Sequence, residues 1–145
     1  MIDPATLPGR PCSVAAALEL VGDRWALLAV QEISFGNNRF SQIARNTGAP
    51  RDRLAARLKA LVEAGVLTRD DGYHLTDAGR ELVPVIWALF AWGDRWAVTE
   101  PPTRMHHHDH GFTPVTACAG CGEKVAGSEI TLEVLAPGWN KAGRT

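Results

Sequence analysis

Residues 39–59 read RFSQIARNTGAPRDRLAARLK, and the pattern of this stretch decides the fold. Its first part is typical of a short helix over 40–46, which Thr47-Gly48 closes. Pro50 suits the first turn of a second helix that runs to about Ala64. One apolar stripe along this second helix is formed by Leu54, Leu58, Leu61 and Val62. The stretch therefore predicts two helices joined by a tight turn.

The same stretch concentrates positive charge. It holds six basic residues and one acid, for a net charge of +5, whereas the other residues hold nine basic and fifteen acidic groups, for a net of −6. Duplex DNA carries one negative charge per ~1.7 Å of its axis. A basic helix pair on an otherwise acidic protein therefore indicates a surface that binds double-stranded DNA.

Upstream of this stretch the sequence predicts an arm and two helices. Three prolines in 1–11 favour an irregular arm. The Ala- and Leu-rich residues 12–21 predict one helix, and 24–34 predict a second, capped by Asp23. Trp25 falls in this second helix, where we expect it to belong to the core.

Downstream the sequence predicts a hairpin and a long helix. Two short strands, 66–69 and 73–76, flank an Asp70-Asp71-Gly72 turn. Thr76 is placed to cap one helix that continues to about Val98. This helix carries more aromatic surface than a small domain needs to bury, so part of it is expected to contact a partner subunit; the aromatic residues are Trp87, Phe90 and Trp92.

The order of these elements predicts a mainly helical fold with a small β-wing, the winged helix-turn-helix. We expect an N-terminal arm over 1–11, a DNA-binding and dimerisation domain over 12–99, and a separate extension over 100–145. The break before the extension is marked by Glu100-Pro101-Pro102.

The length and composition of the chain indicate the cellular compartment in which we expect it. The chain has 145 residues, and no apolar run approaches the ~20 residues of a membrane span. The N-terminus lacks the apolar segment of a signal peptide. Three cysteines cannot all pair within one chain, which favours a reducing compartment. We therefore expect a cytoplasmic protein with no membrane partner.

The order and spacing of several motifs resemble the HxlR-type regulators, a winged-helix group related to the MarR repressors. The resemblance extends from Pro11 to Val98 and rests on Cys12, Arg39-Phe40, Pro50-Arg51, GDRWALL (22–28), LAARLKALVEAGVL (54–67), YHLTDAGREL (73–82) and WGDRW (92–96). It implies a bacterial, cytoplasmic, homodimeric transcription regulator. The helix over 50–64 would read operator DNA, and the terminal helices would form the dimer.

Two positions depart from the pattern of the resembled family. Ala49 stands where the family usually has a Ser that caps the DNA-reading helix, a cap worth roughly 1 kcal/mol. The hairpin turn Asp70-Asp71-Gly72 is short and acidic, whereas the family's is usually longer and basic. Because two carboxylates repel a backbone phosphate, this turn argues against a wing that contacts DNA.

Helical geometry divides the DNA-binding candidates into two groups. Arg53 and Lys59 are expected to face the groove, whereas other side chains of the hairpin are expected to hold phosphates. The full set of predicted DNA-binding residues is Arg39, Ser41, Gln42, Arg51, Arg53, Arg57 and Lys59.

Cys12 matches a cysteine that some members of the resembled family use to sense electrophiles or oxidants. A thiol at a helix N-terminus is more readily ionised, which favours that role. The alternative is a buried, small apolar side chain at the start of the first helix.

The extension contains a predicted zinc site. His107 and His110 are spaced i, i+3, as are Cys118 and Cys121, and zinc favours four such ligands. Either of the two other neighbouring histidines, His106 and His108, could substitute. Strands over 112–117 and 129–135 would frame a small lobe resembling a zinc ribbon, whose folding energy the metal would supply. The alternatives are a flexible His-rich tail with two free thiols and a dithiol redox pair.

These features together predict a homodimeric transcription regulator, a repressor that binds a pseudo-palindromic operator and responds to a small-molecule or redox signal. Two other classes remain: a metal or thiol-redox protein that uses the Cys118/Cys121/His cluster, and a protein-interaction module that has lost DNA binding. An enzyme is not expected, because the sequence has no paired nucleophile and base, phosphate loop or matched carboxylates.

Overall fold

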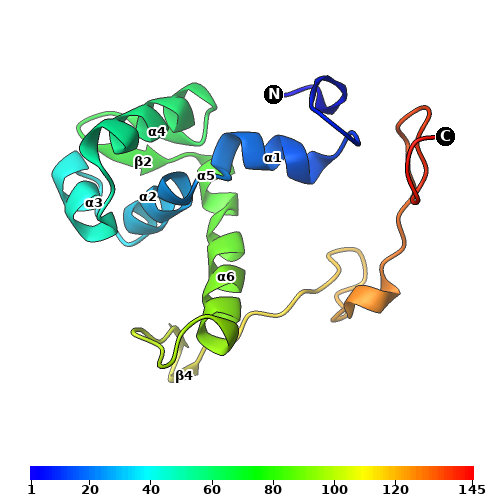
Figure 1. Ribbon diagram of the computed structural model, residues 1–145. Coiled ribbons are helices and arrows are strands. Elements are labelled where there is room, and N and C mark those ends of the chain that lie inside the picture. Colours follow the sequence, from blue (N-terminus) through cyan, green and yellow to red (C-terminus); the bar gives the residue numbers. More distant parts are fainter. The chain divides into compact units, whose positions relative to one another are not determined.

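The computed structural model describes residues 1–145 and forms two units, Met1–Val83 and Pro84–Thr145 (Figure 1). The first unit begins with a short 3-10 helix, Pro4–Thr6. Its remaining elements are α1 (Ser13–Val21), α2 (Arg24–Ser34), α3 (Phe40–Thr47), α4 (Arg51–Glu63), β1 (Leu67–Arg69), β2 (Tyr73–Leu75) and α5 (Asp77–Glu81). This is the predicted order, and the fold is mainly helical with small two-stranded sheets, as in a winged helix-turn-helix.

Helix α2 lies at the centre of the first unit and packs against α1, α3, α4 and β2. Its buried face carries Ala29 and Val30, which have no exposed surface. The apolar stripe predicted on α4 is confirmed at three of its four positions, since Leu54, Leu58 and Leu61 are buried and Val62 is half-buried. Burial of such side chains stabilises the fold by roughly 1.5–3 kcal/mol each.

Local signals set the ends of these helices. The side chain of Asp23 accepts a hydrogen bond of 2.9 Å from the backbone of Trp25, so it caps α2 as predicted. Thr76 caps α5 in the same way, through the backbone of Gly79 at 3.2 Å. Gly48 ends α3 at a φ of 71°, a left-handed conformation that suits glycine. The turn between α3 and α4 therefore follows from its sequence.

The wing is attached to the loop before α3. Strands β1 and β2 are antiparallel, with Thr68 opposite His74. Outside this pair, the backbone of Tyr73 donates a 2.9 Å hydrogen bond to the carbonyl of Asn38. Gly72 has a φ of 117°, and a Cβ there would come within 3.0 Å of the Asn38 side chain. Only glycine therefore lets the wing approach this loop so closely.

The chain from Thr76 onward differs from its prediction in two ways. A single helix was expected from Thr76 to about Val98, but α5 ends at Glu81 and a separate α6 spans Val83–Trp96. Pro84 accounts for the break, because proline has no N–H and suits only the first turn of a helix. The predicted strands over 112–117 and 129–135 are also wrong. The structure has β3 (His106–His107) and β4 (His110–Gly111) instead.

Residues 112–117 and 129–135 have no ladder of strand partners. The bridge that involves them is an isolated one between Ala117 and Lys124, and a 3-10 helix occupies Gly127–Glu129. No residue from 87 to 145 is buried, so this region has no apolar core against which strands could pack. None of the helices has the length and apolar composition needed to cross a membrane.

Candidate nucleic-acid interface

Helices α3 and α4 carry six of the seven predicted DNA-binding side chains, the seventh, Arg39, is the N-cap residue of α3, and none of the seven is buried. Gln42 is half-buried because its side chain turns back toward the start of α3, where it accepts a hydrogen bond of 3.4 Å from the backbone of Arg39. The other six residues are exposed. The structure thus brings the predicted set together on one helix pair, while the role of each residue in binding stays a prediction.

The exposed face of α4 divides into two edges. On the edge toward α3, the Arg51 guanidinium lies 4.8 Å from the ring centre of Phe40, a cation–π contact. Lys59 is also exposed, with its ammonium 3.9 Å from Glu63. This ion pair is exposed, so it restrains Lys59 only weakly. Ala55, Ala56 and Ala60 are exposed on the same helix, and their small side chains leave its outer surface narrow.

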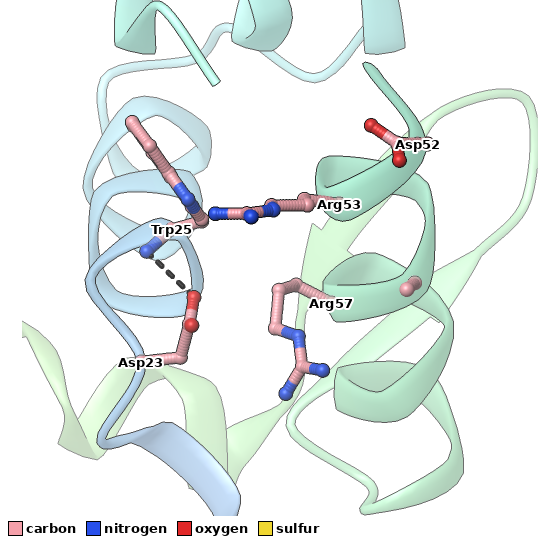
Figure 2. Close-up of a pocket in the computed structure, with 6 residues that line it drawn as sticks. Asp23, Trp25, Asp52, Arg53 and Arg57 are labelled. Carbon is pink, nitrogen blue, oxygen red and sulfur yellow. Dashed lines mark hydrogen bonds between the residues drawn. The ribbon is translucent and has the colours of Figure 1, made fainter. Parts of the chain in front are cut away.

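Arg53 and Arg57 lie on the edge of α4 that faces α2 (Figure 2). With Asp23 and Trp25 they line a shallow pocket of about 320 Å³, and Figure 2 shows both arginines extending from α4 toward α2. Trp25 is half-buried and lines this pocket, so its predicted place in the core is wrong. A third arginine, Arg24, lies over the Trp25 ring, with its guanidinium carbon 4.6 Å from the ring centre. The pocket therefore places two arginines and two carboxylates, those of Asp23 and Asp52, around one indole.

The wing turn is tied to the start of α3. Arg39 and Asp71 form a salt bridge of 2.8 Å between an exposed guanidinium and an exposed carboxylate. The hydrogen bond from Arg39 and its positive charge lower the pKa of the Asp71 carboxyl, and the same contact raises the pKa of Arg39. Asp71 also has a positive φ of 45°. One of the two wing carboxylates is thus neutralised by a residue predicted to bind DNA.

The start of α4 has no side-chain cap. Pro50 occupies the N-cap position, one residue earlier than its predicted place in the first turn, and makes no capping hydrogen bond. Ala49 is buried, and its backbone donates to the Thr47 hydroxyl at 3.2 Å. The missing Ser therefore leaves the first N–H groups of α4 free to meet an anion such as a phosphate.

Cys12 occupies the N-cap position of α1 and is partly exposed, so it is not the fully buried apolar group of the alternative interpretation. The backbone N–H groups of Ala15 and Val14 lower the pKa of its thiol, and the charge of Arg10 acts in the same direction. A thiol with a lowered pKa and access to solvent is the kind that reacts with electrophiles.

The four predicted zinc ligands lie in two pairs. His107 and His110 are opposite each other in the β3–β4 hairpin, with ring centres 5.8 Å apart. The Cys118 thiol is hydrogen-bonded to Cys121; the backbone N–H of Cys121, then that of Gly120, then the Cys121 thiol lower its pKa. The two pairs do not meet, since no three His, Cys, Asp or Glu side chains of the chain are gathered closely enough to hold a metal ion.

Comparison with known proteins assigns the family. Residues 20–101 match the model of the HxlR-like helix-turn-helix family, a span that includes α2 to α6 and the wing. The chain belongs to the HxlR family. Because this is a family of transcription regulators, the protein is a helix-turn-helix transcription regulator and not an enzyme.

Proteins similar to this HxlR-family chain support the same assignment. The HTH-type transcriptional regulator Rv3095 of Mycobacterium tuberculosis is 42% identical over 133 residues, which cover 83% of this chain and 84% of the relative. The crystal structure of PA1607, a candidate transcription factor, matches with a TM-score of 0.74 and 31% identity, over 84% of this chain and 94% of that one. The quinone-bound YodB of B. subtilis matches with a TM-score of 0.52 and 30% identity, over 59% of this chain and 99% of YodB.

One structural residue of this HxlR-family protein was missed from the sequence. Glu32 is only 8% exposed, and one of its carboxylate oxygens accepts hydrogen bonds from the side chains of Asn37, at 2.8 Å, and Asn46, at 2.9 Å. Glu32 thereby joins the end of α2 to the loop before α3 and to α3 itself. A charged residue on the apolar face of a predicted helix was the available signal, because such a group needs partners when buried.

Proposed function

We propose that the chain is a homodimeric repressor that binds a pseudo-palindromic operator. The α4 helices of two copies would enter successive major grooves about 34 Å apart, the spacing of one helical turn. The single observation that carries this proposal is the exposed cationic surface of α3 and α4 within an HxlR fold. In α4 it lies opposite the buried leucines, so it is available to DNA without disturbing the core.

Exposed apolar side chains support the dimer. On α1, Val14 and Leu18 are 64% and 57% exposed. On α6, Leu89, Trp92 and Trp96 are 50%, 61% and 66% exposed. Large apolar groups in water are unfavourable by roughly 25 cal/mol per Å². A second copy that covers them would bury the aromatic surface that the sequence has in excess.

Cys12 is the proposed receiver of the signal, and a quinone is the proposed class of electrophile. The lowered pKa of its thiol and the quinone-bound state of a 30% identical neighbour support this choice. The Cys12 sulfur would add to a ring carbon of the quinone. The thiol proton would end on one ring oxygen and the hydrogen of the attacked carbon would move to the other, giving a hydroquinone thioether without any other oxidant. The adduct would change the dimer and release DNA.

Selection of genomic fragments by the purified full-length protein tests the DNA-binding part. We expect an enriched inverted repeat whose half-sites are about one helical turn apart. Sedimentation of the protein with this repeat should give two chains per duplex. Enrichment of no sequence would contradict the operator, and one chain per duplex would contradict the homodimer.

The signal is tested separately on the enriched repeat. Incubation with benzoquinone should add its mass to the peptide that contains Cys12 and should weaken binding to the repeat. Cys12→Ser should bind the repeat like the wild type and keep binding after benzoquinone. If the Cys12→Ser protein is released equally, the signal acts elsewhere.

A further inference from the structure

Cys118 and Cys121 form a pair of thiols that the proposed function does not use. Only Ala119 and Gly120 separate them in the chain, and both thiols are exposed and free of disulfides. The side chain of Cys121 is hydrogen-bonded to the Cys118 sulfur. The two sulfur atoms therefore lie next to each other at the surface of the extension, where a reagent from solvent can reach both.

The backbone around the pair is held in a closed turn. The N–H of Gly122 donates to the carbonyl of Cys118 at 2.6 Å, and the N–H of Cys118 donates to the carbonyl of Glu123 at 2.9 Å. Just outside these bonds, Ala117 and Lys124 form an antiparallel bridge. A disulfide needs Cα atoms about 4.4–6.8 Å apart, a separation that residues i and i+3 of a tight turn can meet. Joining the two sulfurs therefore requires little movement of the backbone.

The hydrogen bonds of the turn distinguish the two sulfurs. The backbone N–H groups of Cys121 and Gly120 are directed at the Cys118 sulfur, and the Cys121 thiol is bonded to it as well. Hydrogen bonds to a sulfur stabilise its negative charge, and the thiolate is the form of cysteine that attacks an oxidant. The contacts thus favour Cys118 as the attacking sulfur and Cys121 as the thiol that completes the bond.

We propose that Cys118 and Cys121 are a reversible dithiol switch, which a hydroperoxide oxidises to an intrachain disulfide. The Cys118 thiolate attacks one peroxide oxygen, the O–O bond breaks, and the other oxygen leaves and takes up the thiol proton. With hydrogen peroxide this gives a sulfenic acid on Cys118 and one water. The Cys121 sulfur then attacks the Cys118 sulfur. The S–S bond forms, the S–O bond breaks, and the oxygen leaves with the Cys121 proton as a second water.

This switch is separate from the proposed signal at Cys12. Cys12 belongs to the first unit, whereas both cysteines of the pair belong to the second. The products also differ, because addition of a quinone consumes one thiol and leaves a thioether, whereas peroxide joins two thiols and leaves a disulfide. Either reaction can therefore fail in an experiment without affecting the other.

The test is the reaction of the reduced full-length protein with hydrogen peroxide, in the presence of a metal chelator. Remaining thiols are alkylated, and the peptides are weighed by mass spectrometry. The peptide that contains both Cys118 and Cys121 should lose the mass of two hydrogens and escape alkylation, and dithiothreitol should restore both thiols. Cys12→Ser is the matched control and should form the same disulfide at the same rate.

Single substitutions test the order of attack. Cys121→Ser should stop at a sulfenic acid on Cys118, which dimedone traps, and should form it at the wild-type rate. Cys118→Ser should react with peroxide about tenfold more slowly or less, because it lacks the sulfur that receives the N–H groups. Every α-helix lies between residues 13 and 96, so circular dichroism should show unchanged helix content in both variants.

Three results would overturn the proposal. One is a pair that stays reduced while peroxide oxidises the thiol of Cys12. Another is a disulfide from Cys118 or Cys121 to Cys12 or to a second chain, which electrophoresis without reductant and peptide mapping would reveal. The third is equal rates for the two single variants, which would contradict attack by Cys118.

Discussion

Large aliphatic residues form a buried core in the winged-helix unit, whereas none is buried in the extension. In the first unit, leucines of α4 are fully buried and the helices around α2 share one core. In the extension, Ile130, Leu132 and Leu135 are 55%, 69% and 81% exposed. Hydrophobic residues thus stabilise a fold only where neighbouring elements can cover them. The comparison predicts that equal substitutions have unequal effects in the two regions.

Leu58→Ala should have the largest effect. Leu58 has no exposed surface, so the substitution removes buried methyl groups and leaves a cavity, at a cost of about 2–5 kcal/mol in the free energy of unfolding. Leu132→Ala in the extension is the matched control and should change it by less than about 0.5 kcal/mol. Urea unfolding followed by circular dichroism measures both. Equal losses would mean that the extension has a core of its own.

Glu32→Ala tests whether the first unit also depends on buried polar contacts. Without the carboxylate, the amide groups of Asn37 and Asn46 lose their acceptor, which should cost about 1–3 kcal/mol of unfolding free energy. Glu32→Gln keeps one acceptor oxygen and should cost less. The same urea experiment distinguishes them; an alanine variant as stable as the wild type would show that water replaces the carboxylate at no cost.

Arg53→Ala and Lys59→Ala should separate binding from folding. Each removes an exposed cation from α4, so each should weaken operator binding by about tenfold or ~1.4 kcal/mol while leaving the unfolding midpoint unchanged. Lys124→Ala removes one cation from the extension and is the matched control. Fluorescence anisotropy at several salt concentrations is the measurement. If both α4 variants bind like the Lys124→Ala protein, α4 does not read the operator.

Asp71→Ala should have the smallest effect on stability. Arg39 lowers the pKa of the Asp71 carboxyl in the folded protein, so this contact stabilises the fold above the ordinary Asp pKa. Its contribution is lost as pH falls through the lowered pKa of the folded state. The small stability difference between wild type and Asp71→Ala should therefore disappear in acid, as thermal unfolding at a series of pH values would show.

The same variant should bind DNA more tightly than the wild type, because it removes a carboxylate from the wing and frees Arg39. Asp77→Ala, which removes the acid of another exposed pair with Arg80, serves as the control in anisotropy measurements. Tighter binding by both variants would reflect net charge alone, and weaker binding by Asp71→Ala would mean that the salt bridge positions the wing for DNA.

The sequence predicted the first unit well because its signals are local. Asp23, Gly48 and Thr76 each act within a few residues, and helical periodicity is visible without knowing the neighbours. The place of Trp25 could not be predicted in this way, since it depends on which residues of α4 lie beside α2. The Arg39–Asp71 pair joins residues far apart in sequence, so it too requires the fold.

The extension was predicted poorly for a related reason. Residues 112–117 and 129–135 have the composition of strands, but a strand requires a partner with which to share hydrogen bonds. Pro84 is a visible signal for the break between α5 and α6, but the apolar periodicity around it favours one continuous helix. The grouping of the predicted DNA-binding residues follows from the helix pattern alone, whereas their individual contacts depend on the tertiary fold.

Helix α4 keeps its structural and its outward-facing positions on separate residues. Leu54, Leu58 and Leu61 hold the helix in place, while Ala55, Ala56 and Ala60 face solvent with almost no side chain. New side chains at these alanines would meet water or a ligand and not the core. The preference for a DNA sequence could therefore change, in evolution or by design, through a few replacements of these alanines with little loss of folding stability. This makes the helix a suitable starting point for a library of variants with altered DNA specificity.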